Sequence, residues 1–129
     1  MTSTDSGSTP RPVGPYTPAV RAGEWVICSG QLGLRDGVMV DGGVAAQVTQ
    51  ALANLAALLA GHGASLQSVA KTTVFLADID DFPTMNDAYT AAFGDHRPAR
   101  SAFAVAALPL GALVEIEAWA YVGSGTGGR

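Results

Sequence analysis

The chain has 129 residues, enough for one domain around one hydrophobic core and too few for two. Its net charge of −4, with seven Lys and Arg residues, argues against a nucleic-acid binder, because phosphate contacts need a basic surface. Charged residues make up 14% and hydrophobic residues 48% of the chain, so part of the surface is expected to be covered in an oligomer.

Both ends of the chain lack the pattern of a folded element. Residues 1–13 are rich in Ser, Thr, Gly and Pro and predict a flexible arm rather than a secretory signal, and residues 123–129 predict a flexible tail. The single domain is therefore predicted at 14–122. With Cys28 as the sole cysteine and no run approaching the length of a membrane span, we expect a cytoplasmic protein.

The first predicted elements are short strands. Residues 24–29 are rich in β-branched and aromatic side chains and predict a strand that Gly30 stops. A shorter strand is predicted at 19–22. Residues 34–40 contain an Asp-Gly pair that is typical of a two-residue hairpin turn.

The clearest helix is predicted at 44–60, where apolar side chains recur every three or four residues. We assign Gln47, Gln50 and Asn54 to its wetter side. The glycine-rich segment that follows is expected to end the helix, with a glycine in the left-handed conformation.

Residues 69–77 predict a strand with almost no polar break, typical of a central strand buried on both faces. The next helix is predicted to run to about Phe93, with Asp80 or Asp81 as its N-cap and Pro83 in its first turn. Its apolar stripe consists of Phe82, Met85, Tyr89 and Phe93.

Two more strands are predicted at 100–106 and 113–122. The order of elements predicts an α+β fold, a mixed sheet with two helices on one face. In the last strand one alternating set of side chains suits burial under helices. The other set consists of Leu113, Glu115, Glu117, Trp119 and Tyr121. Such a mixture suits a subunit interface that contains a polar site.

The chemistry of the chain is concentrated in two segments. Arg100 begins one strand, and Glu115 and Glu117 share a face of another. A guanidinium can bind a carboxylate through two parallel hydrogen bonds, and two nearby carboxylates raise one another's proton affinity, which suits acid–base catalysis. We therefore expect a guanidinium beside a carboxylate, in a site for a small anionic substrate. A structural ion pair between Arg100 and Glu115 or Glu117 is the alternative.

The cysteine and the two histidines do not predict a catalytic or metal site. Cys28 is expected to be a buried strand residue rather than a nucleophile. His62 and His96 are isolated and lack ligand spacing, so no metal site is predicted.

Six short blocks occur in order at compatible spacing. They are Gly-Pro-Tyr at 14–16, Cys-Ser-Gly-Gln at 28–31, Lys-Thr-Thr-Val-Phe-Leu at 71–76, Met-Asn-Asp-Ala-Tyr at 85–89, Pro-Ala-Arg-Ser at 98–101 and Val-Glu-Ile-Glu-Ala at 114–118. Together they resemble the Rid (YjgF) family, named for reactive intermediate deaminases. The resemblance implies a chorismate-mutase-like (YjgF-like) fold that assembles as a homotrimer, with sites between neighbouring subunits.

The resemblance also implies an activity, that of a RidA-type deaminase in metabolite damage control. Such enzymes hydrolyse 2-imino acids, and enamines such as 2-aminoacrylate, to 2-oxo acids and ammonia without a cofactor. By position, Arg100 would bind the substrate carboxylate and Glu117 would orient or activate water. The pocket would be lined by Tyr16, Ser29, Gly30, Asn86 and Ala102. From the residues alone, Ser29 could equally cap backbone, Tyr16 pack at an interface and Asn86 mark a helix border.

Two features depart from the family pattern. Ala102 stands where many deaminase-type members have a cysteine, and the segment 94–98 looks shorter than usual. Both lie close to Arg100 in the chain, so they bear on substrate choice. The alternatives are a related deaminase or hydrolase of a specialised pathway and a non-catalytic trimer that binds a small ligand. An endoribonuclease is a further alternative, which the acidic balance disfavours.

Overall fold

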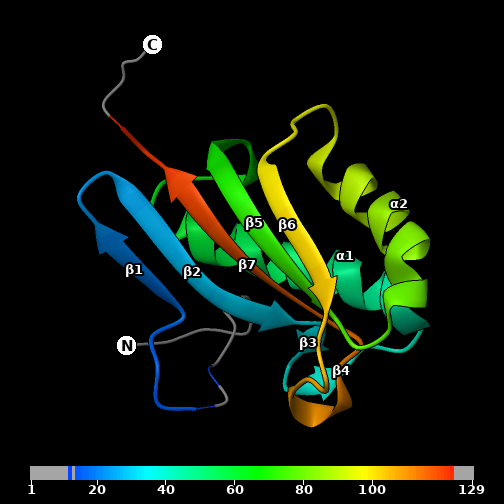
Figure 1. Cartoon of the computed structure of the whole chain (residues 1–129). Helices are drawn as coiled ribbons and strands as arrows, with labels where there is room; N and C mark the ends of the chain where they lie inside the picture. The colour runs from blue at the N-terminus through cyan, green and yellow to red at the C-terminus, as the bar shows by residue number, and fades with distance from the viewer. Residues whose placement is uncertain (1–11, 13, 124–129) are drawn as a thin grey trace.

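The computed structural model describes residue 12 and residues 14–123. It is a two-layer α+β structure in which both α-helices cover one face of a five-stranded sheet (Figure 1). Apart from Pro12 and Gly123, the predicted arm at 1–13 and tail at 123–129 lie outside the described residues.

The sheet has the strand order β1-β2-β7-β5-β6 (Figure 1). Its strands are β1 (Ala19–Ala22), β2 (Trp25–Leu32), β5 (Val69–Leu76), β6 (Ala99–Ala104) and β7 (Val114–Tyr121). Strands β5 and β6 are parallel, and the other neighbours are antiparallel. The sheet is therefore mixed and mostly antiparallel, and β6 is an edge strand.

The other elements join or cover these strands. A separate hairpin is formed by β3 (Leu34–Arg35) and β4 (Val38–Met39), with Asp36 and Gly37 at positive φ in its turn, as predicted. The helices are α1 (Gly43–Ala60) and α2 (Phe82–Phe93), with short 3-10 turns η2 (Leu66–Ser68), η3 (Ile79–Asp81) and η4 (Pro109–Gly111).

The predicted helix ends are partly wrong. Gly61 caps α1 in a right-handed conformation, and Gly63, two residues later, has the positive φ of 73°. Asp81 stands at the N-cap of α2 without a side-chain hydrogen bond. A capping carboxylate is found at the preceding turn η3, where the Asp78 side chain accepts a hydrogen bond from the backbone N–H of Asp80 at 2.9 Å.

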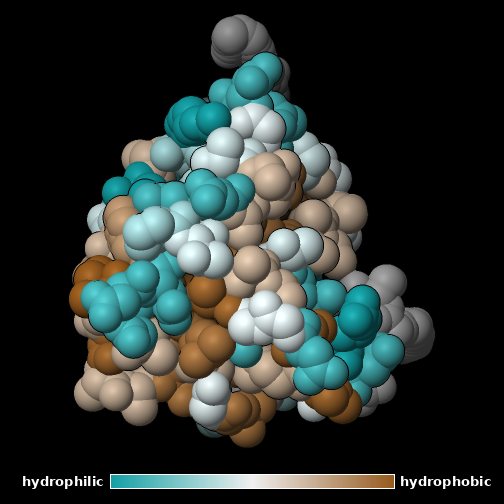
Figure 2. Space-filling view, turned by 90° about the vertical axis from the view of Figure 1, so that its right-hand side faces the viewer, coloured by the Kyte–Doolittle hydropathy of each residue, from teal (hydrophilic) through white to brown (hydrophobic). Residues whose placement is uncertain are grey.

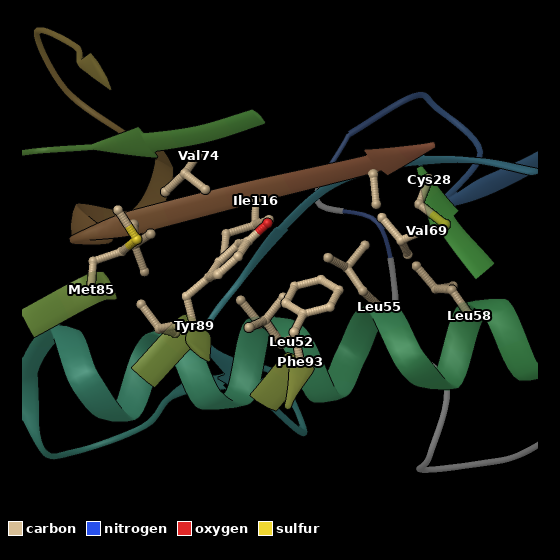
Figure 3. Close-up of a cluster of buried hydrophobic side chains, with 14 of the residues drawn as sticks. Cys28, Leu52, Leu55, Leu58, Val69, Val74, Met85, Tyr89, Phe93 and Ile116 are labelled. Carbon is tan, nitrogen blue, oxygen red and sulfur yellow. The ribbon is translucent and has the colours of Figure 1, made fainter. Parts of the chain in front are cut away.

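The core lies between the sheet and the two helices. Figure 3 shows side chains of α1 and α2 meeting those of the strands in this layer. Among the described residues, α1 alone has the length and apolar composition of a membrane span, contrary to the prediction that no run approaches one. Half of that helix is buried inside the protein, in keeping with a core helix.

Two amides assigned to the wetter side of α1 are in fact buried. The side-chain oxygen of Gln47 accepts a hydrogen bond from the backbone N–H of Leu113 at 2.8 Å. The side-chain N–H group of Asn54 donates to the carbonyls of Leu32 at 3.1 Å and Leu34 at 2.9 Å. These amides satisfy backbone groups where strands enter or leave the sheet, which a helical periodicity does not reveal.

Asn54→Ala is expected to lower the free energy of unfolding by about 1–3 kcal/mol, because the two carbonyls lose their donor inside the protein. Urea denaturation followed by circular dichroism measures this loss. Thr49→Ala is the matched control, since Thr49 lies on the exposed side of the same helix. Equal losses in the two variants would contradict this role of Asn54.

Strand β2 continues through Gly30, contrary to the prediction that this glycine ends it. The register of β2 against β7 shifts between Cys28 and Gln31, so that Ser29 and Gly30 both lie opposite Glu117. Two residues opposite one define a β-bulge. The bulge allows β2 to continue beyond Gly30, and it places Gly30 beside the acidic residue Glu117.

Strand β5 lies inside the sheet, between β7 and the edge strand β6, but contrary to the prediction only one of its faces is buried. Thr72, Val74 and Leu76 lie under the helices, whereas the alternate side chains are half-buried on the opposite side. We call that opposite side of the sheet the open face. On β7 the open face carries Glu115, Glu117, Trp119 and Tyr121.

Aromatic side chains gather on the open face. The ring of Trp25 contacts the rings of Trp119 and Tyr121 edge-on, with centroids 6.1 and 5.1 Å apart, and all three side chains are exposed. Phe75 and Phe103 form a further edge-on pair with centroids 5.4 Å apart. An exposed apolar surface of this kind is typical of an interaction site.

Candidate active site

Arg100 lies on β6 and faces α2. Its guanidinium carbon is 4.8 Å from the ring centre of Tyr89 and 5.5 Å from that of Phe82. One guanidinium N–H lies 3.8 Å from the sulfur of Met85. No carboxylate within the described part of the chain pairs with Arg100, so a structural ion pair with Glu115 or Glu117 is not present.

Arg100 and Glu117 project from opposite faces of the sheet. The register pairs Arg100 with the buried Thr72, on the helix side, and pairs Glu117 with Thr73, on the open face. Their strands are separated by β5, so their backbones are about 10 Å apart at the usual strand spacing. The expectation of a guanidinium beside a carboxylate is therefore not met within one chain.

Glu117 lies among three of the predicted pocket residues. Ser29 and Gly30 lie opposite it in the bulge. The Ser29 hydroxyl donates to the carbonyl of Thr17 at 2.8 Å, and the Ser29 N–H donates to that of Pro18 at 2.8 Å. These bonds hold the segment that carries Tyr16, whose side chain is 41% exposed, next to the bulge. We call Tyr16, Ser29, Gly30 and Glu117 the acidic half-site.

Glu115 lies over the bulge as well. A side-chain carbon added at Gly30 would overlap the Glu115 carboxylate, so the glycine leaves the space in which this carboxylate lies. Burial, and secondarily the charge of Glu117, raises the pKa of Glu115. The raised proton affinity that the sequence predicts for two carboxylates on one face is thus present, and it falls on Glu115.

Gly30→Ala is expected to push the Glu115 carboxylate into solvent and to return its pKa toward the ordinary value. In the native protein the pKa of Glu115 is above its unfolded value, so the free energy of unfolding falls as pH rises through that interval. The variant should lose that pH-dependent fall. Carbon-13 NMR titration of the glutamate carboxyls measures the pKa directly, and an unchanged titration would show that Gly30 does not hold Glu115 in its buried position.

The other predicted residues lie with Arg100. Ala102 is the next side chain on the helix side of β6 and packs against the core. Asn86 follows Met85 on α2, and its side-chain oxygen is buried without a hydrogen-bond partner. Figure 2 shows the molecule from the side on which α2 lies in Figure 1, where hydrophobic residues lie between hydrophilic ones. We call Asn86, Arg100 and Ala102 the arginine half-site.

The segment before β6 is anchored by its own side chains. A ring nitrogen of His96 donates to the carbonyl of Val69 at 2.7 Å, and Arg97 donates to the carbonyls of Gly94 and His96. His96 therefore has a structural partner. In the part of the chain that the structure describes, no three His, Cys, Asp or Glu side chains gather as a metal site would require.

Cys28 is buried, with 2% of its surface exposed, and burial raises the pKa of its thiol to about 11. The prediction of a buried strand cysteine is confirmed. A thiol with this pKa is protonated at neutral pH and is a poor nucleophile.

Sequence reasoning missed the surroundings of Arg100. It placed Phe82, Met85 and Tyr89 on an apolar stripe but did not connect them with the arginine, and it gave Thr72 no role. The spacing of the stripe identifies the inner side of α2. Which strand the stripe covers depends on the parallel pairing of β5 and β6, which no local pattern records.

The strand order and the two helices on one face define a class of small α+β proteins with solved members. RidA from an Antarctic Psychrobacter superposes with a TM-score of 0.86 at 38% identity, covering 92% of this chain and 97% of that one. TdcF from E. coli, solved with bound serine, gives a TM-score of 0.84 at 34% identity, covering 91% and 95%.

Sequence comparison gives the family. The family model for endoribonuclease L-PSP matches residues 6–122. A 2-iminobutanoate/2-iminopropanoate deaminase of Bos taurus is 47% identical over 116 residues, which are 88% of this chain and 85% of the relative. The chain belongs to the endoribonuclease L-PSP family, which is the YjgF or Rid family that its six sequence blocks predict.

Proposed function

We propose that this chain hydrolyses small 2-imino acids and their enamine tautomers, such as 2-aminoacrylate, to 2-oxo acids and ammonia. The observation that carries the proposal is the half-buried guanidinium of Arg100, whose charge is not balanced by any carboxylate of the described residues. Such a group favours an anion, and a carboxylate matches its parallel N–H donors. The names of the deaminase relatives and the serine bound to TdcF support a small, amino-acid-like substrate.

We further propose that the active site forms between two copies of the chain. The acidic half-site lies on the open face and the arginine half-site on the helix side of the edge strand, so a second copy has to bring them together. The exposed aromatic side chains of the open face offer the apolar surface for such contact. Family resemblance implies a homotrimer, with one site in each of its clefts.

In this site Arg100 would bind the substrate carboxylate and Glu117 would handle the water. As the water oxygen attacks the carbon of the protonated imine, the Glu117 carboxylate takes one of its protons. Glu117 then gives this proton to the nitrogen of the resulting carbinolamine. As the C–N bond breaks and ammonia leaves, the carbonyl forms, and the hydroxyl proton passes to the Glu117 carboxylate, which releases it to solvent. General acid–base catalysis of this kind is worth about 10²–10⁴-fold, or roughly 3–5 kcal/mol of barrier.

The other pocket residues would orient the substrate. The unpartnered side-chain oxygen of Asn86 can accept a hydrogen bond from a substrate N–H group. Because the Ser29 hydroxyl already donates to Thr17, it can offer the substrate only its acceptor oxygen. Tyr16, Gly30 and Ala102 would complete the walls. A protonated imine carbon is already electrophilic, so the step needs no cofactor. We also propose that the enzyme acts in the cytoplasm.

Release of ammonia and 2-oxo acid from imines tests the function. Imines are generated in situ by an amino-acid oxidase from several parent amino acids, and the chain is added at catalytic concentration. Faster release of both products is expected. If no imine is consumed faster, the assignment fails, and binding of 2-oxo acids without turnover would then identify a protein that binds a small ligand.

A further inference from the structure

The surroundings of Arg100 raise a physical question. A half-buried cation that lacks an acidic partner is expected either to move toward solvent or to acquire a counter-charge. Here the guanidinium instead lies against two aromatic rings, at 4.8 Å from Tyr89 and 5.5 Å from Phe82. Cation–π attraction of this kind acts through the ring faces. It uses no N–H donor, so apart from the N–H that lies against the Met85 sulfur, the donors of Arg100 have no partner among the described residues.

The Tyr89 ring is itself fixed from two sides. Its hydroxyl is hydrogen-bonded to the Thr72 hydroxyl at 2.7 Å, and its ring lies 4.7 Å from the ring of Phe93. Figure 3 shows Tyr89 reaching from α2 toward the sheet. Burial raises the pKa of Tyr89, so its hydroxyl is neutral and is not a counter-ion of Arg100.

Packing alone does not explain a threonine at position 72, which is fully buried. It is 0% exposed, it lies beside Arg100 in the parallel register, and valine has the same shape without a hydroxyl to satisfy. A hydroxyl in this layer costs free energy unless it is bonded. Its single hydrogen bond within the described structure is the one that orients Tyr89.

We propose that Tyr89, oriented by Thr72, is a positioning residue for Arg100, and that its ring holds the guanidinium in place without using the N–H donors, so that those not on the Met85 sulfur can bind the substrate carboxylate. This inference rests on the proposed function for its kinetic consequence. Its structural part stands on the contacts among Thr72, Tyr89 and Arg100 alone. Tyr89 and Thr72 therefore affect the affinity of Arg100 for the substrate carboxylate, and other residues carry out the chemistry at the imine carbon.

Three variants separate the ring from the hydroxyl. Tyr89→Leu removes the ring, Tyr89→Phe keeps it, and Thr72→Val removes the orienting partner. Tyr89→Leu is expected to raise KM for 2-imino acids, and the dissociation constant for pyruvate measured by calorimetry, by about 2- to 30-fold, with kcat within about twofold of the parent. Tyr89→Phe should remain within about threefold in both constants, and Thr72→Val should lie between the two.

Leu59→Ala is the control for general loosening of the core, since Leu59 is fully buried on α1 and is not part of either half-site. It should lower stability without changing KM. If Leu59→Ala and Tyr89→Leu raised KM equally, or if Tyr89→Leu bound pyruvate like the parent, the positioning role would be overturned. An equal effect of Tyr89→Phe and Tyr89→Leu would overturn the role of the ring.

A spectroscopic readout keeps this inference separate from the proposed function. The Nε–H signal of Arg100, assigned by its loss in Arg100→Lys, should be displaced by the ring currents of Tyr89 and Phe82. Tyr89→Leu should move it toward the position of exposed arginines, and Tyr89→Phe should not. An unmoved signal overturns the inference even if imines are hydrolysed. A moved signal without imine turnover supports the positioning role and rejects the proposed reaction.

Discussion

Arg100→Ala is expected to lower kcat/KM for 2-imino acids by about 10²–10³-fold, the usual effect of removing one member of a desolvated charge pair. The reason is that Arg100 is the one charged residue of the three that form the arginine half-site. The effect should appear mostly in KM and in the affinity for 2-oxo acids. Steady-state kinetics with imines made in situ, together with calorimetric titration of pyruvate, measures it.

The fold should survive this change. Arg100 lies on an edge strand and forms no ion pair with the described residues, so the melting temperature and the oligomeric state should stay close to those of the parent. Arg100→Lys serves as the matched control, because it keeps the charge and loses the planar pair of donors. It should recover only part of the affinity. Full activity in Arg100→Ala would refute the assignment of this residue.

Glu117→Gln is expected to lower kcat by about 10²–10⁴-fold, since an amide has no carboxylate to take a proton from water. KM should change little, because the carboxylate of the substrate is held by Arg100. Glu115→Gln is the matched comparison: it lies on the same face two residues away and is also half-buried. Single-turnover rates of the two variants separate their roles.

The expected order is a greater loss in Glu117→Gln than in Glu115→Gln. The reverse order would transfer the acid–base role to Glu115, whose pKa is raised and whose carboxylate lies against Gly30. Equal losses would mean that the two carboxylates act as one coupled unit, in which neither can be assigned a separate role.

The elements of the fold were predictable where one local pattern decided them. The stripe of α2 and the Asp-Gly turn of the first hairpin are both confirmed. The predicted strand ends at Gly30, because glycine usually interrupts a strand, but in the structure β2 continues and Gly30 belongs to a bulge. A bulge is set by the partner strand, so the residues of β2 alone cannot show it.

The site was predictable residue by residue but not in its arrangement. The sequence blocks indicate Arg100 and Glu117. Alternation along each strand shows which residues of the same strand share a face with them. Which face each one occupies depends on the pairing of β5 with both β6 and β7, over separations of dozens of residues. That is why two residues predicted to be side by side project from opposite faces of one chain.

The reactivity of Cys28 toward a thiol reagent can report on local unfolding of β2. Cys28 is the sole cysteine of the chain, it is buried in the core layer, and its thiol is protonated at neutral pH. A thiol reagent can therefore reach it only when β2 separates from the helices. The rate of alkylation measures how often this occurs, so that the local stability of the strand bearing the bulge can be followed in the unmodified protein, without an engineered label.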